Sequence, residues 1–109
     1  MDLSKKKCLP CEGGVGKLDQ EKISQLLKEI QGWETFYDST QKIRKNFKFK
    51  DFLEAISFVN KMAAIAEAEN HHPDFEVHYN EVKVVIWTHA IGGLSENDFI
   101  LAAKIDQIV

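Results

Sequence analysis

The sequence predicts an α+β domain: a four-stranded antiparallel sheet with three helices packed on one face. Helix and strand patterns come in the order helix, hairpin, helix, hairpin, helix. The 109 residues suffice for one hydrophobic core but not for two. Hydrophobic residues make up 44% and charged residues 28%, the balance of an ordinary globular protein. We expect a flexible N-terminal arm at 1–18 and a single domain at 19–109.

The first helix is expected to begin after Asp19, which can cap it, and to end at Gly32. Its apolar residues recur at i, i+3, i+4 and i+7 and share one face: Ile23, Leu26, Leu27 and Ile30. Two extended runs follow at 33–37 and 43–49, and the turn residues 38–40 separate them. This pattern predicts the first hairpin.

The longest helical pattern begins at Asp51, which forms a capping-box pattern with Glu54. We expect its buried stripe to consist of six apolar residues: Phe52, Ala55, Ile56, Val59, Ala63 and Ala66. The helix should end by Asn70 or His71, because Pro73 disfavours helical geometry in the residue before it.

The clearest hairpin joins an alternating run at 75–79 to a run at 82–89 across the turn at 80–81. One face of the second run carries Val82, Val84, Ile86 and Thr88. The other face carries Lys83, Val85, Trp87 and His89. Because this second face is more apolar than a solvated face, we expect a partner subunit to cover Val85 and Trp87.

The capping-box pattern Ser95-Glu-Asn-Asp98 predicts the start of the last helix, and it follows the strand-breaking pair Gly92-Gly93. Leu94 and Phe99 flank the box as a hydrophobic staple. The helix is expected to run to the end of the chain, with its stripe at Leu101, Ile105 and Ile108.

Charge and hydropathy exclude several classes of function. The net charge is −3, and the densest basic cluster, 42–50, is interrupted by apolar residues, so nucleic-acid binding is disfavoured. No apolar run approaches the ~20 residues that span a bilayer, and no apolar segment follows the charged start. We therefore expect no membrane association and a cytoplasmic location.

The two cysteines, Cys8 and Cys11, form a single C-x-x-C motif. A structural zinc site requires a second ligand pair, which is missing. A thioredoxin-like redox role requires a strand-to-helix turn, whereas Pro10 here precedes a glycine-rich stretch. The pattern favours a loosely held arm and leaves the pairing of the two thiols open.

Three of the four histidines, His71, His72 and His89, lie where regular structure is expected to end, whereas His78 occupies a surface position within a strand. Imidazole titrates near neutrality, so a group of them can donate and accept protons in an elimination of water. Local capping by His71 and His72 is an equally open interpretation. Metal chelation is disfavoured, because adjacent residues in extended backbone point to opposite sides.

Two carboxylates are candidates for controlling these imidazoles. Glu67 lies one helical turn before His71, and Asp98 lies in the first turn of the last helix. A carboxylate beside an imidazole holds its tautomer and favours its protonated form. The capping box already explains an acid at Asp98, so a catalytic role there would be additional.

The spacing of these residues resembles the signature of the pterin-4a-carbinolamine dehydratase family. The resemblance rests on Glu67-x-x-x-His71-His72-Pro73, Tyr79, Thr88-His89, Gly93-Leu94-Ser95 and Asp98. It extends over nearly the whole chain through Cys8-Leu-Pro-Cys11-Glu-Gly-Gly, Gly32-Trp33, Phe47-x-Phe49-x-Asp51-Phe52 and Leu101-Ala102-x-x-Ile105.

The resemblance implies a hydro-lyase that dehydrates 4a-hydroxytetrahydropterin to quinonoid dihydropterin in tetrahydrobiopterin recycling. It implies no metal and no organic cofactor, a homodimer or homotetramer, and a pathway link to an aromatic amino acid hydroxylase. A non-catalytic dimerisation or assembly factor with the same fold is the alternative.

The resemblance also implies roles for individual residues. His71 and His89 would be the principal acid/base groups, with His72 assisting and Glu67 and Asp98 tuning them. Substrate contacts would come from Asn70, His71, His72, Trp87, Thr88, His89 and Ala90. The chain departs from the animal enzymes at two of these positions: Asn70 replaces an aspartate, and Trp87 replaces a small polar residue.

Overall fold

The computed structural model describes residues 2–8 and 16–109. Its helices and strands are, in chain order, η1 (Leu3–Lys5), α1 (Gln20–Leu27), β1 (Glu34–Asp38), β2 (Thr40–Lys48), α2 (Phe52–Glu69), β3 (Asp74–His78), β4 (Glu81–Ile86), η2 (His89–Ile91) and α3 (Glu96–Asp106). The predicted α+β class and both predicted hairpins are confirmed.

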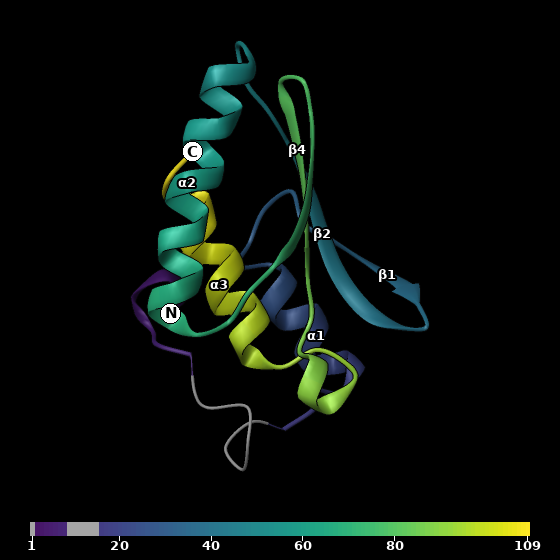
Figure 1. Cartoon of the computed structure of the whole chain (residues 1–109). Helices are drawn as coiled ribbons and strands as arrows, with labels where there is room; N and C mark the ends of the chain where they lie inside the picture. Colours follow the sequence, from purple (N-terminus) through teal and green to yellow (C-terminus); the bar gives the residue numbers. More distant parts are fainter. Residues whose placement is uncertain (1, 9–15) are drawn as a thin grey trace.

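The sheet has the order β1-β2-β4-β3, and every neighbouring pair is antiparallel. The two hairpins therefore join through β2 and β4, whose register runs from Ile43 opposite Ile86 to Lys48 opposite Glu81. The helices gather on one side of the sheet (Figure 1). Alternate residues of β4 are buried against them, as predicted: Val82, Val84 and Ile86.

Aromatic side chains fill the space between β2 and α2. The Phe47 ring lies 4.7 Å from that of Phe58 and 5.9 Å from that of Trp33, and Phe49 lies 5.0 Å from Phe58, all measured between centroids. The Trp33 indole nitrogen donates to the Asp106 carboxylate at 3.1 Å, so the only polar atom of this large ring is satisfied.

The predicted first helix is confirmed, although it is shorter than expected. Asp19 caps it by accepting the Lys22 backbone N–H at 2.9 Å, as the sequence predicts. The α-helix ends at Leu27, and turns carry the chain to Gly32, whose φ of +88° suits glycine. Ile30 is buried although it lies beyond the helix.

The predicted buried stripe of α2 is partly wrong. Ala55 and Ala66 are buried, but Phe52 is 48% exposed and Ala63 is also exposed. Phe58 and Met62 are buried in their place. The helix carries apolar residues of its own on most of its faces, so the periodicity of the sequence does not determine which face is buried. Contact with Phe47 of β2 buries the face that carries Phe58.

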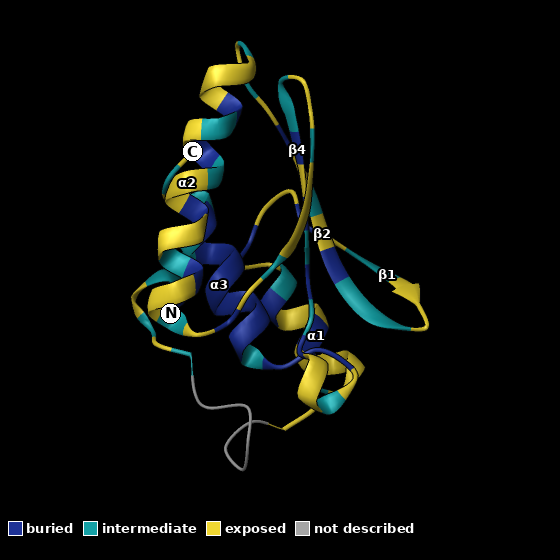
Figure 2. Ribbon diagram, in the orientation of Figure 1, coloured by how far each residue is buried: buried dark blue, intermediate teal, exposed yellow. Residues whose placement is uncertain are grey.

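The capping box of α3 is confirmed, with Ser95 and Asp98 binding each other's backbone N–H groups, and Leu94 and Phe99 are buried beside it. The helix ends at Asp106 rather than at the end of the chain. Its predicted single stripe is too narrow, because α3 is buried along most of its length between the other elements (Figure 2).

The expected end of the fourth strand is also wrong, since β4 stops at Ile86 and His89 begins the short helix η2. The Thr88 N–H donates to the Gly93 carbonyl at 2.9 Å, which closes a tight loop where the strand would have continued. Gly92 permits this loop with a φ of +61°, and its carbonyl accepts the Thr40 hydroxyl.

Residues 2–8 pack on the folded core. Leu3 is only 2% exposed, and Lys104 donates to the Ser4 carbonyl at 2.8 Å. The Cys8 N–H donates to the Glu69 carboxylate at 2.8 Å. Residues 9–15, and with them Cys11, lie outside the described residues, so the division into an arm at 1–18 and a domain at 19–109 stays a prediction.

The described residues contain no helix that is both long and apolar enough to cross a bilayer.

The Cys8 thiol is expected to be unreactive in the folded protein. Burial, followed by the nearby Glu69 carboxylate, raises its pKa to about 12. At pH 8 this lowers the thiolate fraction from about one in ten to about one in ten thousand. In a Cys11→Ser variant, alkylation by iodoacetamide should be far slower in buffer than in denaturant. Equal rates in the two conditions would contradict this expectation.

Candidate active site

The end of α2 places His71. Asn70 adopts the left-handed conformation, with φ of 52°, and its N–H donates to the Glu67 carbonyl at 3.3 Å. The His71 N–H donates to the Ala66 carbonyl at 3.1 Å. These two bonds form a Schellman motif, which ends the helix where the sequence predicts and turns His71 back toward α3.

Substitutions at Asn70 should show how much the left-handed backbone conformation of this residue matters for the stability of the protein. Asn70→Gly is expected to keep wild-type stability, because glycine adopts positive φ freely. Asn70→Val should destabilise by about 1–2 kcal/mol, since a β-branched residue resists that conformation. Urea denaturation of both variants measures the difference. A valine variant as stable as wild type would show that the helix end can relax without the motif.

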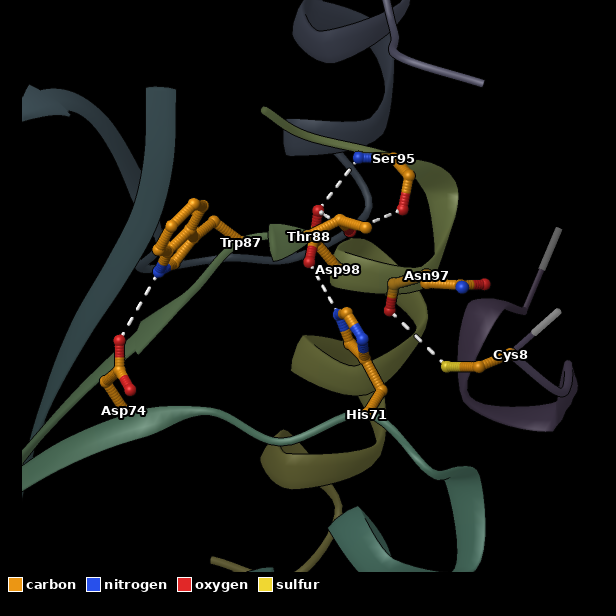
Figure 3. Close-up of polar contacts among 8 residues, drawn as sticks. All are labelled: Cys8, His71, Asp74, Trp87, Thr88, Ser95, Asn97 and Asp98. Atoms are coloured by element: carbon orange, nitrogen blue, oxygen red, sulfur yellow. Dashed lines mark hydrogen bonds and ion pairs between the residues drawn. The ribbon is translucent and has the colours of Figure 1, made fainter. Parts of the chain in front are cut away.

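Asp98 connects the most buried part of the site. Its Oδ1 lies 2.7 Å from His71 Nε2, and its Oδ2 accepts the Thr88 hydroxyl at 2.9 Å and the Ser95 N–H at 2.8 Å (Figure 3). Asp98, Thr88 and Ser95 have no exposed surface, and His71 is 6% exposed. A buried carboxylate needs partners of this kind to offset the loss of its hydration.

The contact with Asp98 bears on which ring nitrogen of His71 carries a proton. When the Asp98 carboxylate is ionised it only accepts hydrogen bonds, and the proton of this contact is then on His71 Nε2. In the neutral ring, Nδ1 then has a free lone pair and can accept a proton. Within the described residues no protein group hydrogen-bonds to Nδ1, which leaves that nitrogen for other chemistry.

Thr88 brings the second histidine to the same region. Its side chain binds Asp98 and lies 2.8 Å from the Ser95 hydroxyl, so it anchors the chain between Trp87 and His89. His89 is exposed at the start of η2, and its ring lies 3.8 Å from the Trp87 ring with an interplanar angle of 31°. The Trp87 indole nitrogen donates to Asp74 (Figure 3).

His72 lies on the solvent side of the helix end. Its Nε2 lies 3.2 Å from the Glu67 carboxylate, and the two side chains are 55% and 78% exposed. Such an exposed pair contributes little to stability. The adjacent imidazoles of His71 and His72 thus bind different carboxylates, one buried and one exposed.

The predicted site residues fall into three groups. His71, Thr88 and Asp98 form one network, and Trp87 and His89 stack next to Thr88. The last group is exposed: Glu67 in the last turn of α2, Asn70 and His72 just after this helix, and Ala90 in η2.

His78 is exposed on β3 and binds Glu76, which confirms its predicted surface position. Sequence reasoning missed three neighbours of the site. Ser95 was recognised only as a cap, although the capping box was a signal that it meets Asp98. Lys42 and Asp74, which contact Trp87, carried no local signal.

The fold and the site together define a small α+β protein with a buried carboxylate–imidazole pair and, one residue beyond Thr88, an exposed imidazole stacked on an indole. A family model described as pterin 4 alpha carbinolamine dehydratase matches residues 16–108. The chain therefore belongs to the pterin 4 alpha carbinolamine dehydratase family, as the sequence resemblance indicates.

Two bacterial relatives carry the name pterin-4-alpha-carbinolamine dehydratase. The protein of Nitrosospira multiformis is 51% identical over 107 residues, which cover 98% of this chain and 92% of the relative. The protein of Rickettsia bellii is 52% identical over 106 residues, which cover 97% and 93%. The likeness thus extends over nearly the whole length of both chains.

Solved structures share the fold. A crystal structure described as transcriptional coactivator/pterin dehydratase from Brucella melitensis has a TM-score of 0.80 and 34% identity, covering 85% of this chain and 98% of that one. A pterin dehydratase-like protein described as a RuBisCO assembly factor in the alpha-carboxysome has a TM-score of 0.61 and 20% identity, covering 72% and 89%. The second likeness shows the fold alone.

Proposed function

We propose that this protein is a hydro-lyase that converts a 4a-hydroxytetrahydropterin to the quinonoid dihydropterin and water. The observation that carries the proposal is the buried His71–Asp98 pair, at 2.7 Å, in a chain that matches the dehydratase family over residues 16–108. The dehydration requires two proton transfers, and the site provides imidazoles for both.

The proposed reaction breaks the C4a–oxygen bond and forms a carbon–nitrogen double bond. The adjacent ring nitrogen supplies the electron pair, the leaving hydroxyl takes a proton and departs as water, and a ring N–H proton is removed. His71 suits the removal of that proton, because its bond to Asp98 leaves Nδ1 as an acceptor. His89, which is exposed, would protonate the leaving oxygen.

His72 and Glu67 take supporting roles in this proposal. Both are exposed at the end of α2. His72 is the residue after His71, and Glu67 lies one helical turn before His71. Their contact orients the His72 ring toward the helix end, where it can assist in binding or in exchanging protons with solvent.

The backbone hydrogen bonds around the site support a smaller set of substrate contacts than the family resemblance implies. The Thr88 N–H binds Gly93, and its carbonyl accepts the Ile91 N–H at 3.3 Å. The backbone N–H groups of Asn70 and His71 are likewise engaged with α2. We therefore assign Thr88 a supporting role and propose that the pterin is contacted mainly by His72, His89 and Ala90 together with the His71 ring.

The purified protein should accelerate the dehydration of a 4a-hydroxytetrahydropterin generated in the assay, followed by the absorbance of the quinonoid product. The uncatalysed reaction and protein inactivated by unfolding provide the reference rates. A folded protein that leaves the uncatalysed rate unchanged would refute the proposal.

We further propose a role in tetrahydrobiopterin recycling in the cytoplasm, in support of an aromatic amino acid hydroxylase, and a homodimeric or homotetrameric assembly. The half-buried Val85 and Trp87 on the outer face of the sheet support an association between subunits. Light scattering during size-exclusion chromatography measures the assembly directly. A monomer at working concentrations would reject this part of the proposal.

A further inference from the structure

We infer that Trp87 is a positioning residue for His89: its indole sets the orientation of the His89 imidazole, while Lys42 and Asp74 hold the indole. The inference rests on the proposed function, because it concerns the histidine that would protonate the leaving oxygen. It changes the part assigned to Trp87 from contacting the substrate to acting through His89.

The two acid/base histidines are held in different ways. A hydrogen bond to a buried carboxylate fixes the ring of His71. His89 is exposed, and within residues 2–8 and 16–109 its imidazole has no hydrogen bond to a protein group. Its contact is the Trp87 ring, at 3.8 Å between centroids and 31° between planes. Stacking of this kind restricts rotation of an otherwise free side chain.

The indole can serve as a support because the strands on both sides of β4 hold it. From β3, the Asp74 carboxylate accepts its N–H at 3.3 Å. From β2, the Lys42 ammonium lies 4.7 Å from the ring centroid, a cation–π contact. Lys42 is itself 14% exposed and lies 3.6 Å from Asp38, which limits where its ammonium can go.

The backbone next to the indole is equally constrained. Thr88 has no exposed surface, and its hydroxyl binds the same Asp98 that binds His71. The buried Thr88 therefore fixes the backbone where the chain leaves the sheet. Trp87 directly precedes this fixed residue, and His89 directly follows it. The stack then orients the second imidazole relative to the first.

Kinetics can separate positioning from substrate contact. If Trp87 positions His89, Trp87→Ala should lower kcat by about 10-fold or more with little change in KM, because misplacement of a catalytic group affects the chemical step. Trp87→Phe should recover much of the loss, since it keeps a stacking surface. In a His89→Ala background, Trp87→Ala should have no further effect on kcat. A raised KM, or a full additional loss in that background, would overturn the inference.

A spectroscopic measurement tests the stack without any turnover. In wild type the His89 ring protons, identified by their absence in His89→Ala, should be shifted upfield by the indole ring current. The shift should disappear in Trp87→Ala and persist in part in Trp87→Phe. The matched control is Tyr37→Ala, which removes an exposed aromatic ring from β1. Unchanged His89 resonances in folded Trp87→Ala would overturn the stack.

The two kinds of failure are distinguishable. If His89→Ala turns over normally, the proposed use of His89 fails, whatever the ring shift shows. If His89→Ala loses turnover but Trp87→Ala keeps both the ring shift and kcat, the proposed function stands and the positioning role of Trp87 is wrong. Circular dichroism and urea unfolding confirm that each variant is folded.

Discussion

Replacing His71 or His89 with Ala is expected to lower dehydratase turnover by ~10² or more, the usual loss when a general acid or base is removed. The two losses should not add, because each proton transfer is required in the same reaction step. Turnover at saturating pterin measures the effect. Near-normal rates in both folded variants would reject the assignment of the two histidines.

The His71 variant needs a companion, because Ala leaves the buried Asp98 carboxylate without its imidazole partner. His71→Gln keeps an N–H donor that can face Asp98 but cannot transfer protons near neutral pH. It should therefore stay closer to wild type in stability and still lose turnover. His78→Ala is the matched control, since it removes an exposed imidazole on β3 and should leave turnover unchanged.

Asp98→Asn is expected to abolish most turnover while keeping the fold. The amide oxygen can still accept the Thr88 hydroxyl and the Ser95 N–H, so the amide nitrogen would face His71. That nitrogen donates, which forces His71 Nε2 to accept and moves the ring proton to Nδ1. Turnover should fall by ~10² or more, and nitrogen NMR should show the reversed tautomer. Normal turnover would contradict the role of Asp98.

Asp98→Ala should in addition destabilise the protein by about 3–5 kcal/mol, because it removes the carboxylate that three buried groups bind, and only the Thr88 hydroxyl keeps a second partner, the Ser95 hydroxyl. These groups are the His71 ring, the Thr88 hydroxyl and the Ser95 N–H. That loss is a large part of the stability of a small domain. Chemical denaturation of the Ala and Asn variants side by side separates the structural effect from the catalytic one.

Local sequence signals predicted the elements well where the structure depends on neighbours in the chain. Asp19 and Asp51 cap their helices by accepting backbone N–H groups three residues on, at 2.9 Å each. The turn of the first hairpin lies where turn residues occur, and the turn of the second, at 79–80, lies one residue before the predicted 80–81 because Glu81 already pairs with His78. Alternation along β4 identified its buried face, because one face of the sheet packs on the helices.

The errors arose where distant segments decide the outcome. The face of α2 depends on the aromatic rings of β2 that pack on Phe58, and the wide burial of α3 depends on the elements around it. The end of β4 depends on the bond from Thr88 to Gly93, whereas the alternating pattern continues past it. None of these contacts has a local period that a sequence pattern can show.

By itself, the sequence determined the fold class, the helix caps and the identity of the histidines and carboxylates, since these follow from spacing and side-chain chemistry. Only the tertiary structure decided which of those residues contact one another and which are buried. It buries His71 against Asp98 and leaves His72 exposed beside Glu67. It stacks His89 on Trp87. The physical reason is that burial and hydrogen-bond partners come from packing between α2, α3 and the end of β4, which are remote from one another in the chain.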